Sequence, residues 1–483
     1  MHNKDRSIKQ HAYALILFMG MSAFMVVFDV RATDLPDGVT APPPHAEQPG
    51  TATESSGDAA SPGSGGDRHE EWWNAHLQST YVWQHKDSFH ALYTGPQSLL
   101  PGPEHAYSLT ATVYLGARLW KGAELYVNPE VAQGLPLSNF FGLASVQNGE
   151  IQKNSGATLR GYWARVFLRQ TINLGAEQFH VDDGLNQLAG NYDKHRLVFT
   201  VGKITLTDLF EKSSYANDPR SQFLNWALIT HGAWDFAADA RAYTIGVAAE
   251  LYWDDWAIRG GRFMEPTEAN GKYLDYNIAR HHGDQLEIEH EHKIGDLPGT
   301  VRVLFFRNRA NAGRYRDAID AANLTGGMPD VTFVRKESTK KGFGLSFEQS
   351  VTEDIGMFAR GSYCDCKVEE YAYAEIDNIV SAGASIKGSR WSRKDDTVGI
   401  AFASSGLNRD HRDYLAAGGL GGFLGDGQLP HYARERVVEL YYNFRVLKGM
   451  HFTLDFQEIT NPGYNADRRG AVHIVGGRLH LEL

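Results

Sequence analysis

Arginine and aromatic side chains share one face of a short segment near position 165. With a period of two, one face carries Trp163, Arg165, Phe167 and Arg169, and the opposite face carries Val166 and Leu168. Guanidinium groups can replace the hydrogen bonds that water makes to a sugar, and aromatic faces can pack against the C–H side of a pyranose ring. The segment therefore predicts weak binding of small polar solutes.

Two further segments offer the same chemistry. Tyr114 and Arg118 share a face of an alternating segment, and residues 215–220 combine turn formers with an aromatic and an arginine that either shape the turn or line a pore. Our candidate pore-lining and sugar-contact residues are Tyr114, Arg118, Trp163, Arg165, Arg169, Tyr215, Asn217, Asp218 and Arg220.

Charged clusters elsewhere do not form a recognisable catalytic or metal-binding set. Glu287, Glu289 and Glu291 form a row on one strand face and do not read as an acid–base pair, since glycosidases need two carboxylates across a substrate. His290 and His292 share the other face with no obvious third metal ligand. There is no G-x-S-x-G motif, and the glycine cluster 418–427 lacks the ending of a phosphate-binding loop. We expect no catalytic residue, cofactor or metal.

The elements that must position these side chains are short strands with one apolar and one polar face. Leu479, Leu481 and Leu483 alternate with Arg478, His480 and Glu482, and the same pattern covers residues 109–119 and 438–445. A soluble β-sandwich gives this alternation too, so composition and targeting must decide between a sandwich and a membrane barrel.

The N-terminal part predicts export. Basic Lys4, Arg6 and Lys9 precede an apolar run over 12–28 and a small-x-small site at 30–32, so residues 1–32 are predicted to be a cleaved signal peptide, with an uncleaved anchor helix as the alternative. Residues 33–70 are rich in Pro, Gly, Ser, Thr and Ala and are expected to form a disordered linker. Residues 71–483 are left for the folded domain, in which no apolar run is long enough for a spanning helix.

Charge and cysteine content exclude other classes. The formal net charge is -11, without the basic footprint of a nucleic-acid-binding protein. Cys364 and Cys366 are the two cysteines. They would lie on one face of a strand, where a bridge between positions two apart is strained, so we expect a free or partly oxidised pair.

About sixteen alternating segments follow Trp73, separated by short turns and longer polar loops in turn, as in outer-membrane barrels. The short connections fall near 121, 254, 296, 353 and 448, and the long ones at 132–160, 205–233, 311–338 and 405–433. In hydrocarbon every backbone N–H and C=O must be paired, and a sheet achieves this only when it is closed. Interfacial girdles are predicted from tryptophans that fall near strand ends, namely Trp83, Trp120, Trp163, Trp253 and Trp256.

Five separated blocks of the sequence belong together as a set. They are Trp73 to Leu100, with WNAHLQSTYVWQHK and YTGPQSLLP; Arg165 to Gly175, with VFLRQTINLG; Arg196 to Leu228, RLVFTVGKITLTDLFEKSSYANDPRSQFLNWAL; Asp410 to Tyr442, with HRDYLAAGGLGGFLGDGQLP; and Asn461 to His480, NPGYNADRRGAVHIVGGRLH. In this order they resemble the OprB-type carbohydrate-selective porins. The resemblance implies an all-β fold, a single closed antiparallel transmembrane barrel of about 16 strands, whose long extracellular loops fold into the lumen and form a constriction that favours sugars.

We therefore expect passive diffusion of monosaccharides such as glucose, or of small polyols, across the bacterial outer membrane. The expected partners are small sugars, outer-membrane lipid and the barrel-assembly machinery, with association into a homotrimer left open and no nucleic acid. Two alternatives are an exporter of a polysaccharide, which predicts a wide lumen of one charge sign, and a structural or adhesive barrel, which predicts a lumen closed to solutes.

Overall fold

The protein is an antiparallel β-barrel closed by its first and last strands. The computed structural model describes residues 70–151, 156–372 and 374–483, so the predicted signal peptide and all but the last residue of the predicted linker lie outside the described residues. Sixteen strands follow each other around the barrel in chain order, and β1 pairs with β16 from Gln78↔Glu482 to Lys86↔Ile474. The predicted fold class is confirmed.

The strands are β1 (Trp73–Lys86), β2 (Glu104–Trp120), β3 (Ala123–Leu135), β4 (Arg160–Val181), β5 (Gly190–Ile204), β6 (Thr244–Trp253), β7 (Trp256–Met264), β8 (His282–Ile294), β9 (Leu297–Ala312), β10 (Lys336–Ser350), β11 (Ile355–Cys364), β12 (Asn378–Lys387), β13 (Thr397–Gly406), β14 (Glu435–Leu447), β15 (Met450–Thr460) and β16 (Val472–Glu482). The α-helices are α2 (Trp226–Ile229), α3 (Tyr315–Thr325) and α4 (Arg409–Ala416). Short 3-10 turns cover 137–140, 206–208, 331–334, 388–391 and 462–464.

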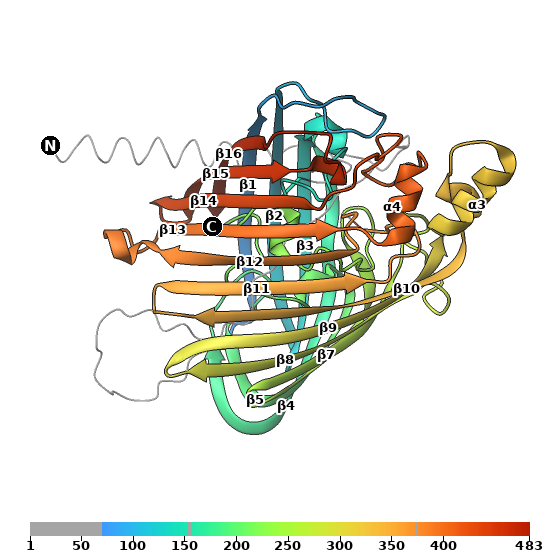
Figure 1. The fold of residues 1–483 in the computed structure, drawn as a ribbon. Coiled ribbons are helices and arrows are strands. Elements are labelled where there is room, and N and C mark those ends of the chain that lie inside the picture. Colours follow the sequence, from blue (N-terminus) through green and yellow to red (C-terminus); the bar gives the residue numbers. More distant parts are fainter. Residues whose placement is uncertain (1–69, 152–155, 373) are drawn as a thin grey trace.

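The two ends of the barrel differ in their connections. At one end, the turn end, most strands are joined by a few residues, as at Gly122, Asp254 and Gly449. At the other end, the loop end, long segments join the strands, and α3 and α4 lie beyond that end (Figure 1). Among the described residues no helix is long and apolar enough to cross a membrane.

The alternation predicted from the sequence sets the two faces of the wall. In β14, Val438 and Leu440 are exposed on the outer surface, whereas Glu439 and Tyr441 are buried inside the barrel. The five tryptophans expected to form girdles are all exposed, and Trp120, Trp253 and Trp256 flank turns at the turn end. An apolar outer band with aromatic edges suits a wall that faces lipid.

The wall departs from simple alternation in β4, where the predicted direction of Trp163 is wrong. Asn128 pairs with Arg165 and Pro129 pairs with Trp163, so Ala164 is an extra residue, a β-bulge. Pro129 has no N–H with which to continue the ladder. Trp163 consequently lies exposed on the outer surface, and Arg165 is buried inside.

The cysteines also differ from the prediction. Cys364 ends β11, and the next turn puts Cys366 at φ 26° in the left-handed region, which shortens the Cα–Cα distance to 5.1 Å. The two form a disulfide. The expectation of a free or partly oxidised pair assumed that both cysteines lie in one extended strand, and the chain instead turns between them.

Candidate pore constriction

The connection between β5 and β6, residues 205–243, crosses the interior of the barrel, and we call it the lumen loop. Its apolar side belongs to the main buried core together with side chains that point inward from the wall. Phe223 packs edge-on against Phe358 at 5.8 Å and Tyr441 at 4.9 Å, and Phe210 packs edge-on against Phe263 at 6.1 Å. Burial of these rings holds the lumen loop against the β7–β14 side of the barrel.

Two arginines of the wall hold the lumen loop from opposite sides. Arg165 of β4 makes two hydrogen bonds of 2.7 Å to the carboxylate of Asp208. Arg360 of β11 donates to the carbonyl of Leu228 at 2.8 Å and to the carboxylate of Glu211 at 2.9 Å. Both arginines are buried, and the paired bonds between Arg165 and Asp208 fix orientation as well as distance.

A third arginine holds the middle of the lumen loop. Arg478 of β16 donates to the carbonyls of Pro219 and Gln222, both at 2.7 Å, and to the hydroxyl of Thr453. Because β4, β11 and β16 lie at separate places around the barrel, the lumen loop is attached to the wall at three points and spans the interior.

Carboxylates of the wall accept hydrogen bonds from the backbone of the lumen loop. Glu287 accepts from the N–H of Glu211 at 2.7 Å, and Glu439 accepts from the N–H of Asn225 at 2.9 Å. These N–H groups would otherwise be buried without partners. The predicted row of glutamates in β8 is therefore present, and Glu287 serves to fix the lumen loop.

Arg220 joins the lumen loop to a second inward segment, residues 136–151. Its side chain donates to Glu150 at 2.9 Å and to the hydroxyl of Tyr114 at 2.8 Å, hydrogen-bonds Gln78, and lies 3.6 Å from Glu130. Arg220 and both glutamates are fully or almost fully buried. The guanidinium of Arg220 thus contacts β1, β2, β3 and the second inward segment.

Burial tunes the ionisation of groups in these loops. It raises the pKa of Glu150 to about 7, against the opposing effect of Arg220. It lowers the pKa of His231 to about 4 although Glu211 lies 3.7 Å away, so His231 is neutral at pH 7.

The turn end is narrowed by the tip of the β4–β5 hairpin, residues 182–189. The pairing of β4 with β5 is irregular between Asn173 and Gln178, and beyond this irregularity the tip contacts the inner wall. Asn186 accepts from Asn128 at 2.8 Å, and the carbonyl of Asn186 accepts from Arg169 at 3.0 Å. Sequence reasoning did not anticipate this second obstruction.

The candidate residues fall into three groups by position. Tyr114, Arg165 and Arg220 are buried inside the barrel in contacts that hold loops. Arg118 lies toward the turn end, 3.4 Å from Glu124. Residues that keep some accessible surface in the interior are Arg169, Tyr215, Asn217 and Asp218. A sugar contact by any of them stays a prediction.

Sequence reasoning missed two of the three wall arginines as site residues, Arg360 and Arg478. Arg478 was visible as a charged residue on the polar face of the last strand. Nothing in the sequence shows that its partners are backbone carbonyls of residues far away in the chain.

Among the described residues, one group brings three possible metal-ligand atoms close together: Cys366, Glu370 and Asp377. The sulfur of Cys366 is used in the disulfide, so this group lacks a thiolate ligand. His290 instead stacks on Trp256 at 4.3 Å, and His292 contacts Gln349 at 3.0 Å.

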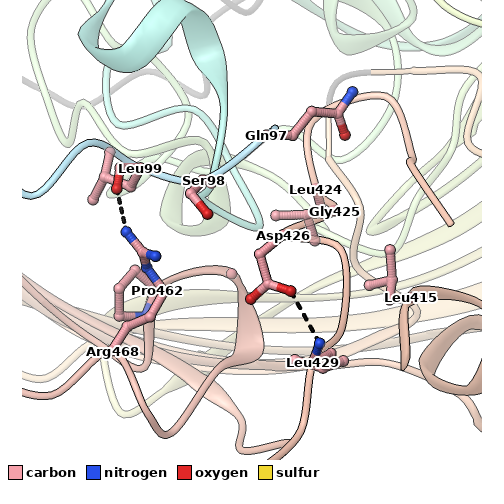
Figure 2. A pocket seen from close by; sticks show the side chains of 12 residues that line it. Gln97, Ser98, Leu99, Leu415, Leu424, Gly425, Asp426, Leu429, Pro462 and Arg468 are labelled. Carbon is pink, nitrogen blue, oxygen red and sulfur yellow. Dashed lines mark hydrogen bonds between the residues drawn. The ribbon is translucent and has the colours of Figure 1, made fainter. Parts of the chain in front are cut away.

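A small pocket of about 10 Å³ lies where four segments of the loop end meet (Figure 2). Asp426 accepts from the N–H of Leu429 at 3.0 Å and from Asn465 at 2.6 Å, and Arg468 hydrogen-bonds the carbonyl of Leu99. The sequence blocks around residues 93–101, 418–430 and 461–469 thus converge here. Hydrogen bonds between these segments hold the loops together around the pocket.

Comparisons with known proteins agree with this architecture. The family model described as "Carbohydrate-selective porin, OprB family" matches residues 98–483. The high-pH structure of Pseudomonas putida OprB aligns with a TM-score of 0.63 at 19% identity, covering 85% of this chain and 94% of that chain.

Two other solved structures align with lower scores. The low-pH structure of Pseudomonas putida OprB has a TM-score of 0.45 at 15% identity, with 85% and 93% coverage. Pseudomonas aeruginosa OccK2 (OpdF) has 0.43 at 9% identity, with 86% and 99% coverage. The fold likeness rests on the first structure, and no curated protein sequence matches the chain significantly.

Proposed function

Because this chain belongs to the OprB family of carbohydrate-selective porins, we propose that it lets monosaccharides such as glucose, and small polyols, diffuse passively into the periplasm. It is an outer-membrane β-barrel of sixteen strands. Diffusion through such a barrel needs no energy input, but selectivity needs a narrow place where a solute gives up part of its water shell.

The observation that carries the proposal is the lumen loop fastened across the interior. Arg165, Arg360 and Arg478 hold it from three parts of the wall, so the lumen loop is fixed inside the barrel and narrows its interior. A rigid constriction can offer the same hydrogen bonds to each passing solute. Binding must stay weak, because a tightly held solute blocks conduction.

Arg169 is the residue we propose as a sugar contact. Its guanidinium lies over the rings of Tyr126 at 5.1 Å and Phe167 at 5.5 Å, and part of its side chain is accessible. The two buried rings hold the guanidinium in place, and its accessible N–H groups can donate hydrogen bonds to the hydroxyls of a sugar. Tyr215, Asn217 and Asp218 are proposed as further contacts because they keep accessible surface on the lumen loop.

The charge pattern of the interior disfavours the exporter alternative. Arg259 binds Glu287 at 2.6 Å and Glu289 at 3.0 Å, and Arg302 binds Glu289 at 2.5 Å, so both signs of charge alternate along this wall. A charged polymer would need a wide lumen of one sign. A neutral solute is better suited to a surface of compensated charges.

The test is single-channel conductance of the purified protein in a planar bilayer, titrated with glucose, other sugars and a charged solute of similar size. Concentration-dependent block by sugars and little by the charged solute supports the proposal. Channels indifferent to sugar would reduce it to a general porin, and absence of channels would favour the structural role.

A matched pair of variants locates the contact. Arg169→Ala should weaken sugar block or raise conductance while the barrel stays folded. Arg262→Ala removes an arginine from the outer surface, where it pairs with Asp284 at 2.7 Å, and should leave block unchanged. Unchanged block in Arg169→Ala would remove Arg169 from the constriction.

A further inference from the structure

Two cations stand side by side on the outer surface at the loop end. Arg307 of β9 and Lys341 of β10 are direct cross-strand partners, and both side chains are exposed. Residues directly opposite each other in an antiparallel pair have Cβ atoms about 5 Å apart, and like charges in such positions repel. The pair therefore needs an anion close by.

Asp284 and Asp365 lie beside the two cations, but neither carboxylate forms an ion pair with them within 4 Å. Asp284, the cross-strand neighbour of Arg307 on the other side, is engaged by Arg262 through two hydrogen bonds of 2.7 and 3.0 Å. Asp365 lies next to Lys341, but it accepts from the backbone N–H of Lys341 at 3.1 Å. Within the described part of the chain, neither Arg307 nor Lys341 has an ion-pair partner within 4 Å.

The next basic residue along β9 behaves differently. Arg309 forms an ion pair with Glu337, which also binds Arg280 at 2.8 Å. Arg309 and Arg280, which lie farther out, are thus compensated by Glu337. Arg307 and Lys341, which lack such a partner, lie next to the apolar outer band, on its loop-end side.

The depth of the pair matches the edge of the lipid-facing band. Phe305 and Phe343 pair with each other directly below it, and both are exposed on the outer surface. From Leu297 at the turn end to Arg307 the strand makes ten residue steps. At about 3.3 Å per step and a tilt of about 40°, this rises about 25 Å, the height of the apolar band of outer-membrane barrels.

We propose that Arg307 and Lys341 bind a phosphate group of a phosphorylated glycolipid in the outer leaflet, with its acyl chains lying along Phe305 and Phe343. Long loops of these barrels face the cell exterior, so the pair lies at the headgroup level of the outer leaflet. Guanidinium and ammonium groups are the usual phosphate ligands of proteins. The apolar wall beneath favours a lipid over free phosphate.

The test measures lipid binding to the intact protein in detergent, by native mass spectrometry with diphosphorylated lipid A and with the same lipid after enzymatic removal of its phosphates. The wild-type protein should bind the diphosphorylated lipid more tightly. The double variant Arg307→Gln/Lys341→Gln should lose about 5- to 30-fold of this affinity, the effect of two cations at an anionic surface.

Arg436→Gln is the matched control. Arg436 is an exposed residue at the loop end of β14, and its cross-strand neighbours Thr460 and Ser404 are uncharged. It should bind lipid as the wild type does. Equal binding of both lipids by the wild type, or unchanged affinity in a double variant whose barrel still shows heat-modifiable mobility, would overturn the proposal.

Discussion

Replacing Arg220 by glutamine is expected to loosen the joint between the two inward loops while leaving the barrel wall intact. Arg220 is 1% exposed and donates to Glu150 at 2.9 Å and Tyr114 at 2.8 Å, with Glu130 at 3.6 Å. Glutamine is shorter and neutral, so it leaves Glu150 and Glu130 buried without their cation.

The magnitude follows from the cost of a broken buried pair. At a pH well above 7, where Glu150 is ionised, removing one partner of a buried ion pair costs about 3 to 5 kcal/mol because the remaining charge loses its compensation. A value of about 4 kcal/mol corresponds to about a thousandfold change in the equilibrium between docked and undocked loop. The wall hydrogen bonds of β1–β3 do not depend on Arg220, so the effect should be local.

Hydrogen exchange is the assay that measures this equilibrium. Backbone amides near the joint, such as that of Gln222, which donates to Asp218 at 2.8 Å, should exchange up to about a thousandfold faster in Arg220→Gln. Amides of β12 and β13 should keep their protection. Single-channel records should show more noise, since the lumen loop would leave its docked position more often.

Two controls separate the ion pair from side-chain size. Glu150→Gln combined with Arg220→Gln removes both charges and should recover part of the protection, because no uncompensated charge is left between these two residues. Arg262→Gln on the outer surface should change nothing measurable. Unchanged exchange in Arg220→Gln would refute the view that this guanidinium fastens the loops.

Three further results are expected. Gly142 lines the small pocket at the loop end, has φ +85°, and an added Cβ would meet the backbone nitrogen of Leu99 at 1.8 Å. Gly142→Ala should therefore undock the loops around this pocket and raise protease sensitivity there, and wild-type protease resistance would contradict this. Burial alone lowers the pKa of His411, but Asp377 at 3.2 Å and a second buried carboxylate outweigh it and raise the pKa to about 9. The protonated imidazole therefore stabilises the docking of α4 fully below about pH 6.5. The protection factors of α4 amides, which correct exchange for its intrinsic rise with pH, should fall as the pH passes through 9, and protection factors that do not change with pH would exclude this role. Leu440→Arg places a charge on the exposed outer face of β14 and should lower the free energy of unfolding from bilayers by about 2 to 4 kcal/mol, the cost of an arginine facing lipid near mid-depth. Denaturant titration against Leu440→Ala measures this difference.

The sequence predicted which strand residues face lipid and which face the interior, because the polarity of each side chain matches the side of the wall on which it lies. Val438 and Leu440 against Glu439 and Tyr441 are enough to orient β14, and the same reading orients β2 and β16. Local alternation failed where a bulge inserted Ala164 and turned Trp163 outward. A bulge depends on which residue lies opposite, here Pro129, and that pairing is not visible in one strand.

Alternation also gave no warning that part of the interior is apolar. In β9, Leu304, Phe305 and Phe306 follow one another, and Leu304 and Phe306 are buried inside while Phe305 is exposed outside. A run that is apolar on both faces signals a strand covered on both sides. Here lipid covers one face and the lumen loop covers the other.

The sequence by itself determined the number, direction and two-faced character of the strands, and with them the closed barrel. These properties depend on residues close together in the chain and on the rule that backbone groups in hydrocarbon must be paired. Only the tertiary structure shows that the lumen loop and the second inward segment occupy the interior of the barrel. Arg478 binds the carbonyl of Pro219, and Arg220 binds Glu150, across separations that no local pattern encodes, so the shape of the constriction follows from long-range pairing of buried charges.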